Sequence, residues 1–136
     1  MRTVKIVVGV LTVLLIVILS GLNMKRSGDS TVYAASNEIK LSGTVQDVQE
    51  YFCPVTDDRG THLLLDLGGG ETTVVHVAVG RFLRENRVAF SPGQRIQVIG
   101  AKIRINGKDA VIAREITRGN EVITLRNAQG KPLWTN

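Results

Sequence analysis

From residue 38 onward, hydrophobic and polar residues alternate in short segments, the period expected of strands with one buried face. In the first segment Ile39, Leu41 and Val45 fall on one side, and Lys40 and Ser42 fall on the other. The alternation is interrupted once, by a stretch whose charged residues and apolar pair fit a helix. The pattern predicts strands over residues 38–49, 61–67, 71–79, 94–105, 109–117 and 121–126, and a short helix over 81–87.

Glycine-containing turns separate these segments. Gly68-Gly69-Gly70 lies between the second and third strands, and Asn106-Gly107, the strongest hairpin signal in the chain, lies between the fourth and fifth. Three strands, a helix and two further strands follow the order of the OB-fold, a five-stranded Greek-key barrel. Gly43 and Gly100, inside predicted strands, suit the bends of such a barrel. We therefore predict a small all-β, five- to six-stranded OB-like domain over residues 38–136.

The first 24 residues have a different character. Residues 6–24 contain no charge and are mostly Val, Leu and Ile, a length that can cross a bilayer as a helix. The segment is predicted to be a signal peptide or a signal anchor, and residues 25–37 a linker. Val32-Tyr33-Ala34 offers a cleavage site after Ala34, whereas the long apolar run and the distance to that site favour retention. Both outcomes place the domain outside the cytoplasm, in the periplasm or an equivalent compartment.

The positive charge is concentrated in this leader. The chain of 136 residues carries a formal net charge of +5, but residues 1–35 hold four basic residues and one acidic residue. The remainder is close to neutral, whereas nucleic-acid-binding domains usually carry a basic stripe. The strands that would bind a single strand, residues 61–67 and 71–79, also lack Phe, Tyr and Trp. Single-stranded nucleic-acid binding is therefore the least favoured function.

The C-terminal two-thirds of the chain resembles a group of small exported bacterial proteins with an OB-like domain and no assigned biochemical activity. The resemblance is carried by five stretches of sequence. They are Val75-His76-Val77-Ala78-Val79-Gly80 with Phe82-Leu83; Pro92-Gly93; Val98-Ile99-Gly100; Ile112-Ala113-Arg114-Glu115-Ile116; and Leu125-Arg126 with Gly130-Lys131-Pro132-Leu133-Trp134. It implies the fold and export, and it brings no catalytic residues.

Catalytic signatures are absent from the sequence. Gly68-Gly69-Gly70 lacks the lysine and helix that follow a phosphate-binding loop, and there is no Cys-x-x-Cys pair, His-Glu-x-x-His helix or calcium loop. Neither histidine lies beside a strained serine turn. We therefore predict a protein without enzymatic activity and without a resident cofactor, the metal alternative below excepted.

Cys53, His62 and His76 are the one group of residues with chemistry beyond packing. His62 lies seven residues before Gly69 and His76 seven after, so a hairpin centred there makes them cross-strand neighbours on one face. With Cys53 nearby, the three residues would suit a transition metal or haem. The alternative is that both imidazoles and the thiol simply pack on the barrel.

A second candidate surface is the rim of the barrel. Tyr51 and Phe52 precede Cys53-Pro54 in the first loop, where OB-folds commonly bind ligands, and Arg59 follows. Arg81 and Arg84 form a basic cluster on the predicted helix, suited to an anionic partner or a lipid surface. The leading hypothesis is a binding or assembly module of the cell envelope, with a protein or small ligand as partner.

Overall fold

The fold is organised around one strand, β1 (Glu38–Cys53), which is long enough to belong to both halves of a barrel. In the computed structural model, which describes residues 29–135, a 3-10 turn η1 (Ala35–Asn37) leads into it. The other elements are β2 (Asp58–Gly68), β3 (Glu71–Val79), α2 (Gly80–Glu85), β4 (Arg95–Ile105), β5 (Lys108–Arg118) and β6 (Glu121–Thr124). The predicted leader helix lies outside the described residues.

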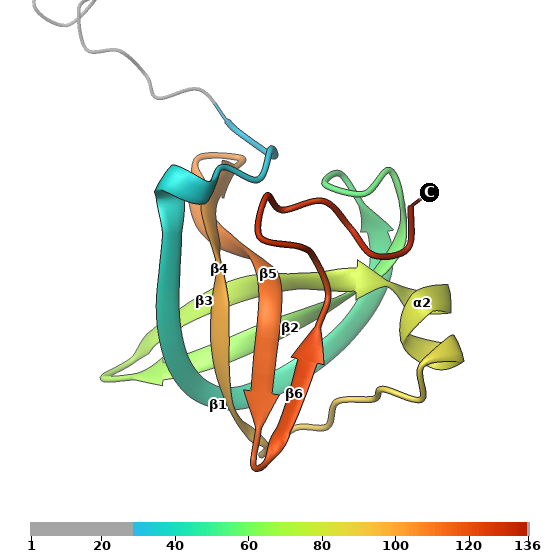
Figure 1. Cartoon of the computed structure of the whole chain (residues 1–136). Coiled ribbons are helices and arrows are strands. Elements are labelled where there is room, and N and C mark those ends of the chain that lie inside the picture. Colours follow the sequence, from blue (N-terminus) through green and yellow to red (C-terminus); the bar gives the residue numbers. More distant parts are fainter. Residues whose placement is uncertain (1–28, 136) are drawn as a thin grey trace, which may run out of the picture.

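The strands form one sheet in the order β3-β2-β1-β4-β5-β6, with antiparallel neighbours throughout (Figure 1). β1 pairs with β4 through its first seven residues and with β2 from Thr44 onward. A short parallel contact between β3 and β5, from Val74 to His76, closes the sheet into a barrel. This connectivity confirms the predicted OB-like barrel with one short helix.

Two glycines allow the strands to cross at close range. A Cβ atom on Gly43 of β1 would lie 2.4 Å from the carbonyl oxygen of Asp66, and one on Gly100 of β4 would lie 2.2 Å from that of Ile112. The ladder between β4 and β5 also shifts register at Gly100. The bends predicted at these glycines are therefore places where only a residue without a side chain fits.

Several element boundaries differ from the predicted ones. β1 runs four residues further, because its ladder with β2 continues as far as the pair Cys53 and Asp58. Helix α2 ends earlier, and Arg87 beyond it adopts a positive φ of 55°. β6 stops at Thr124 because the next two residues, Leu125 and Arg126, both donate their N–H to the carbonyl of Arg114 instead.

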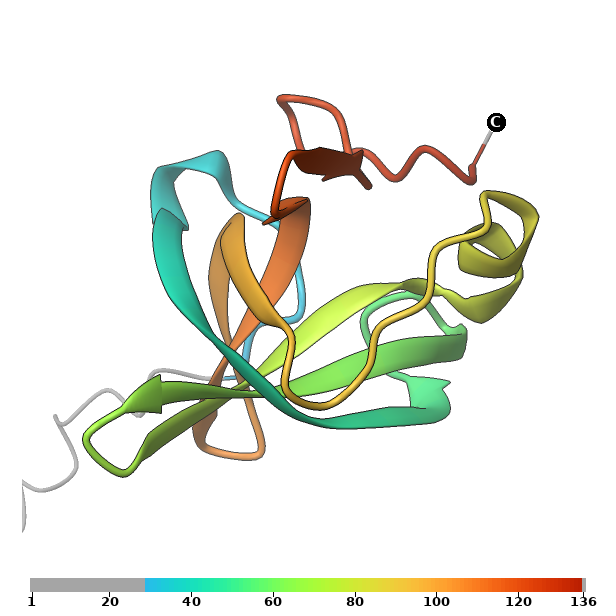
Figure 2. The same ribbon diagram turned by 90° about the horizontal axis from the view of Figure 1, so that it is seen from below.

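The barrel interior holds the main core, to which every strand contributes, including the fully buried Leu63, Leu65, Val98 and Ile116. A smaller cluster around Ile112 lies apart from it. The C-terminal segment packs beside α2 (Figure 2), where Phe82 and Trp134 have ring centroids 5.3 Å apart. Within residues 29–135, no helix is both long enough and apolar enough to cross a bilayer.

Candidate metal centre

Three metal-binding side chains converge where β1, β2 and β3 lie side by side. Cys53 is the last residue of β1, and the β2–β3 ladder pairs His62 directly with His76, as the count about Gly69 predicts. One donor atom from each residue lies within 4.8 Å of the others. All three residues are buried, with exposed fractions of 2%, 2% and 4%. The donors therefore face one another in a space closed to bulk water.

Cys53 and His76 are already in direct contact. The Cys53 Sγ and the His76 Nδ1 are 3.2 Å apart, which is hydrogen-bonding distance for sulfur. Burial, reinforced by the neighbouring His62 and by Arg126, lowers the pKa of His76 to about 4. At neutral pH the imidazole is thus uncharged, the state in which a histidine binds a metal.

His62 is held by aromatic contacts alone. Its ring stacks on Tyr51 with centroids 3.7 Å apart and planes 7° from parallel, and it meets His76 edge-on at 4.7 Å. Neither ring nitrogen has a hydrogen-bond partner among residues 29–135. Burial lowers the pKa of His62 to about 4; the Gly60 backbone opposes this shift but lacks hydrogen-bonding geometry toward the ring. Buried polar atoms without partners are rare and costly, so these two ring nitrogens are the polar atoms of the site that call for an explanation.

A buried cation lies beside the three donors. Arg126 is 2% exposed, and its Nη1 donates to the carbonyl oxygens of Val77, at 3.2 Å, and Ala113. The guanidinium also lies over the Trp134 ring, 4.8 Å from its centroid. Burial lowers the pKa of Arg126 to about 10, partly offset by the Cys53 sulfur and by Tyr33. Among the described residues, no carboxylate contributes to the pKa of His62, His76 or Arg126.

These separations suit a single ion. Metal–sulfur and metal–nitrogen bonds of about 2.3 and 2.0 Å place neighbouring ligand atoms roughly 3.3–3.8 Å apart. The Cys53–His76 pair is near this range at 3.2 Å. The widest separation in the group is at most 4.8 Å, so closing the site requires a movement of about 1 Å, within the reach of an imidazole rotation.

An open cleft adjoins the centre. It has a volume of about 760 Å³, and its lining includes Tyr51 and Pro54 from the β1–β2 side, His76 from β3, and Ile105 and Lys108 beside the β4–β5 turn. The Tyr51 ring, 38% exposed, covers His62 from this side. The cleft therefore provides a route to the donors, and Tyr51 stands across it.

A protein-family model matches residues 37–123, which is more than half of the chain and includes all three donors. The model describes the MamS/MamX magnetosome protein family. The chain belongs to this family. No curated protein matches the chain significantly.

Two solved structures are similar to this MamS/MamX family member. The S. pombe Stn1-ten1 complex aligns with a TM-score of 0.50 and 16% identity, over 62% of this chain and 59% of that one. The mitochondrial single-stranded DNA-binding protein Rim1 of S. cerevisiae aligns with a TM-score of 0.43 and 10% identity, over 68% of this chain and 97% of that one. The first likeness supports the OB-like barrel of the family member. It also shows that this chain spans only part of that protein's length.

The structure separates the predicted rim residues of the family member into two groups. Tyr51 stacks on His62 of the candidate centre, and Phe52 beside it is 60% exposed. Arg59 donates to the Glu50 carbonyl at 3.4 Å, and Arg84 pairs with the Glu50 carboxylate at 3.1 Å. These arginines lie outside the cleft lining, as does Arg81, which is exposed on α2. The predicted basic cluster is thus a surface feature separate from the centre.

Arg126 is the residue of this site that the sequence pattern does not reveal. It is the last residue of the predicted strand 121–126 and lies just beyond β6 in the structure, and an arginine at such a position is ordinarily exposed. The available signal is the aromatic Trp134 eight residues later, beyond Gly130 and Pro132, a spacing that lets the chain double back onto the guanidinium.

The two buried histidines predict that acid destabilises the metal-free family member. Their folded pKa values near 4 lie below the value of 6.5 for an exposed histidine, so protons bind preferentially to the unfolded chain. The contribution of the two histidines to stability is therefore fully present above pH 6.5 and is lost as the pH falls toward 4, by roughly 3 kcal/mol for each histidine. Urea unfolding from pH 8 to pH 4 measures this loss. The variant His62→Phe should lose less over the same range, and an equal loss would contradict the assignment.

Proposed function

We propose that this protein is a non-enzymatic binding module of the cell envelope, and that its ligand is a soft transition-metal ion held by Cys53, His62 and His76. The observation that carries the proposal is His62, whose ring is buried, uncharged at neutral pH and without a hydrogen bond at either nitrogen. A bound ion would satisfy it and would replace the Cys53–His76 hydrogen bond with two stronger contacts.

The charges around the centre favour monovalent copper. A thiolate and Cu(I) together are neutral, whereas a thiolate with Zn(II) leaves a positive charge beside the buried Arg126. Among the described residues, no carboxylate contributes to the pKa of these groups, so none balances such a charge. One thiolate and two imidazoles also match the softness that copper prefers.

A porphyrin fits this arrangement less well than an ion. An imidazole that ligates haem iron needs an open face wide enough for the ring system. Here the two imidazoles are at most 4% exposed and face each other and the thiol within 4.8 Å. The chain also has a single cysteine, so it lacks the paired thiols of covalent haem attachment.

The test is Cu(I) binding by the purified full chain in detergent, measured anaerobically by competition with a chromophoric chelator. We expect one equivalent per chain and at least about a 100-fold loss of affinity in Cys53→Ala or His76→Phe, because each removes one of three ligands. The exposed β6 substitution Val122→Ala is the control and should bind normally.

Two outcomes separate the parts of this proposal. If Zn(II) bound stoichiometrically and Cu(I) did not displace it, the three-residue site would be supported and Cu(I) as its ion would be contradicted. Affinities for both metals that are unchanged in Cys53→Ala and His76→Phe would reject the site itself, since the chain has no other cysteine or histidine.

A further inference from the structure

Residues 29–37, which we call the strap, precede the barrel and lie along its β4–β5 hairpin (Figure 1). The Asp29 carboxylate accepts the backbone N–H of Asn106 at 2.7 Å and of Gly107 at 3.1 Å. Ser30 forms an antiparallel bridge with Arg104, with N···O distances of 2.9 and 3.1 Å. The predicted linker is thus joined to the hairpin by four hydrogen bonds at its first two described residues.

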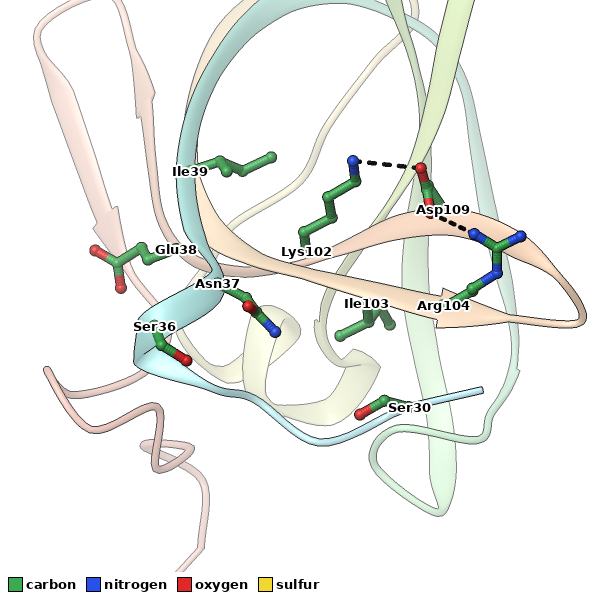
Figure 3. Close-up of a pocket in the computed structure, with 9 residues that line it drawn as sticks. All are labelled: Ser30, Ser36, Asn37, Glu38, Ile39, Lys102, Ile103, Arg104 and Asp109. Atoms are coloured by element: carbon green, nitrogen blue, oxygen red, sulfur yellow. Dashed lines mark hydrogen bonds and ion pairs between the residues drawn. The ribbon is translucent and has the colours of Figure 1, made fainter. Parts of the chain in front are cut away.

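Figure 3 shows the strap from Ser30 to Asn37 passing the hairpin, with a pocket of about 430 Å³ between them. On the hairpin side of this pocket, Asp109 is paired with Lys102 at 3.3 Å and with Arg104 at 3.5 Å. The hairpin's charges nearest the strap are therefore partly neutralised by each other. The strap is held chiefly by hydrogen bonds to backbone and by packing.

Tyr33 connects the strap to the barrel wall and to the C-terminal segment. Its hydroxyl donates to the Glu38 carboxylate at 2.5 Å, and Arg114 donates to the same carboxylate at 2.7 and 3.0 Å. The side chain packs against the smaller core cluster around Ile112. It also covers Gly130, where an added Cβ would lie 2.2 Å from the tyrosine ring. The start of β1, the smaller core cluster and the C-terminal segment therefore all meet at this one strap residue.

The sequence Val32-Tyr33-Ala34, the candidate cleavage site, is consequently part of the folded domain. A cut after Ala34 would remove the Asp29, Ser30 and Tyr33 contacts and leave the Glu38 carboxylate with one hydrogen-bond donor fewer. A protease that acts on the folded chain binds the residues on both sides of its target in extended form, and here only the residues before the cut are extended. Here Ala35 begins the 3-10 turn η1, whose Asn37 N–H donates to the Ala34 carbonyl at 2.9 Å.

Few residues separate the uncharged N-terminal segment from the strap, and this limits how far apart the two can lie. Five Cα–Cα steps separate Met24, the end of the uncharged segment, from Asp29, which is fixed on the β4–β5 turn. Fully extended, five steps span at most about 18 Å. An apolar segment in a bilayer would therefore hold this turn within that distance of the membrane surface.

We propose that the strap remains in the mature protein and that it holds the β4–β5 hairpin toward the membrane in which residues 6–24 are anchored. The interaction surface is the hairpin turn with the strap, and its partner is the lipid surface. The β5–β6 turn, at the other end of β5, points away from it (Figure 1). The cleft beside the metal centre, which the hairpin also lines, then opens at the membrane-proximal end of the domain.

The first test is the state of the chain itself. The full-length protein, expressed with its leader in a bacterial host and recovered from membranes, should have the mass of a chain that retains residues 1–34. A membrane or soluble form that begins at Ala35 would overturn the proposal. The strap contacts are tested by chymotrypsin, which cleaves after tyrosine: Tyr33 should resist cleavage in the folded wild-type protein.

Gly130→Ala tests the same contacts without altering the cleavage sequence, because the added methyl group collides with the Tyr33 ring. We expect cleavage after Tyr33 to become at least 10-fold faster. Gly119→Ala is the matched control: Gly119 also has a positive φ, 60° against 83°, but nothing lies within 4 Å of its added Cβ. Equal cleavage rates in the two variants would show that the contact between Tyr33 and Gly130 does not hold the strap in place. That result would contradict this part of the proposal.

The orientation is tested with a photo-crosslinking amino acid in place of Lys108, beside the β4–β5 turn, or Asn120, in the β5–β6 turn; both positions are exposed. In vesicles of phosphatidylethanolamine and phosphatidylglycerol, lipid adducts should form at least five times more often at position 108. Equal yields at the two positions, or a higher yield at position 120, would overturn the proposed orientation.

Discussion

Excess Cu(I) is expected to raise the thermal midpoint of the full-length protein by about 20 °C. A ligand present at about 1,000 times its dissociation constant stabilises the native state by roughly 4 kcal/mol. For a domain of about 100 residues, each kcal/mol moves the midpoint by about 4–8 °C. The expected stabilisation is large because Cys53, His62 and His76 come from three strands, so an unfolded chain does not present them together. Differential scanning calorimetry under anaerobic conditions measures the shift.

The same measurement on Cys53→Ala distinguishes the site from general metal binding. This variant should unfold with nearly the same midpoint with and without copper, because its remaining imidazoles bind a single ion weakly. A midpoint that rises equally in wild type and Cys53→Ala would place the ion elsewhere on the protein. A midpoint that copper leaves unchanged in the wild type would contradict binding to the folded state.

Replacing Arg126 with alanine is expected to lower the free energy of unfolding by about 3 kcal/mol, and the midpoint by about 15 °C. The variant leaves the carbonyl oxygens of Val77 and Ala113 buried without a donor, and it removes the guanidinium from the face of Trp134. Removing a buried charge also removes its desolvation cost, which limits the loss. Urea unfolding followed by circular dichroism measures the change.

Arg126→Lys is the matched control, since it keeps the charge but loses the planar group that spans two carbonyls and stacks on Trp134. We expect an intermediate loss of about 1–2 kcal/mol. If the alanine variant were as stable as wild type, the guanidinium would contribute no net stability, and the C-terminal segment would be held by other contacts.

The local part of this site follows from the sequence with little ambiguity. Counting from Gly69 pairs His62 with His76, and the structure confirms that pairing despite register shifts on either side of the ladder. Hairpin geometry depends on the turn and the adjacent residues, so a short stretch of sequence suffices to predict it. The extension of β1 as far as Cys53 was missed, because Glu50 to Phe52 interrupt the alternation that marks a strand.

The hydrophobic pattern does not predict contacts between segments that are distant in the sequence. Most residues of the strap are small or polar, which is typical of a linker, and their partners lie some 75 to 100 positions later, at Asn106 and Gly130. Arg126 presents the same difficulty, since its donors meet carbonyls of β3 and β5. Periodicity describes which face of an element is buried, and it carries no information about which distant chain covers that face.

The placement of the three donors within one meander has a consequence for the order of folding. Cys53, His62 and His76 all lie between the end of β1 and the middle of β3, whereas closing the barrel requires β5 to pair with β3 across the intervening helix and β4. Contacts between nearby residues form sooner than those that close long loops. The metal ion that we propose would therefore meet Cys53, His62 and His76 while the barrel is still open, and Arg126, near the end of the chain, would then enclose it.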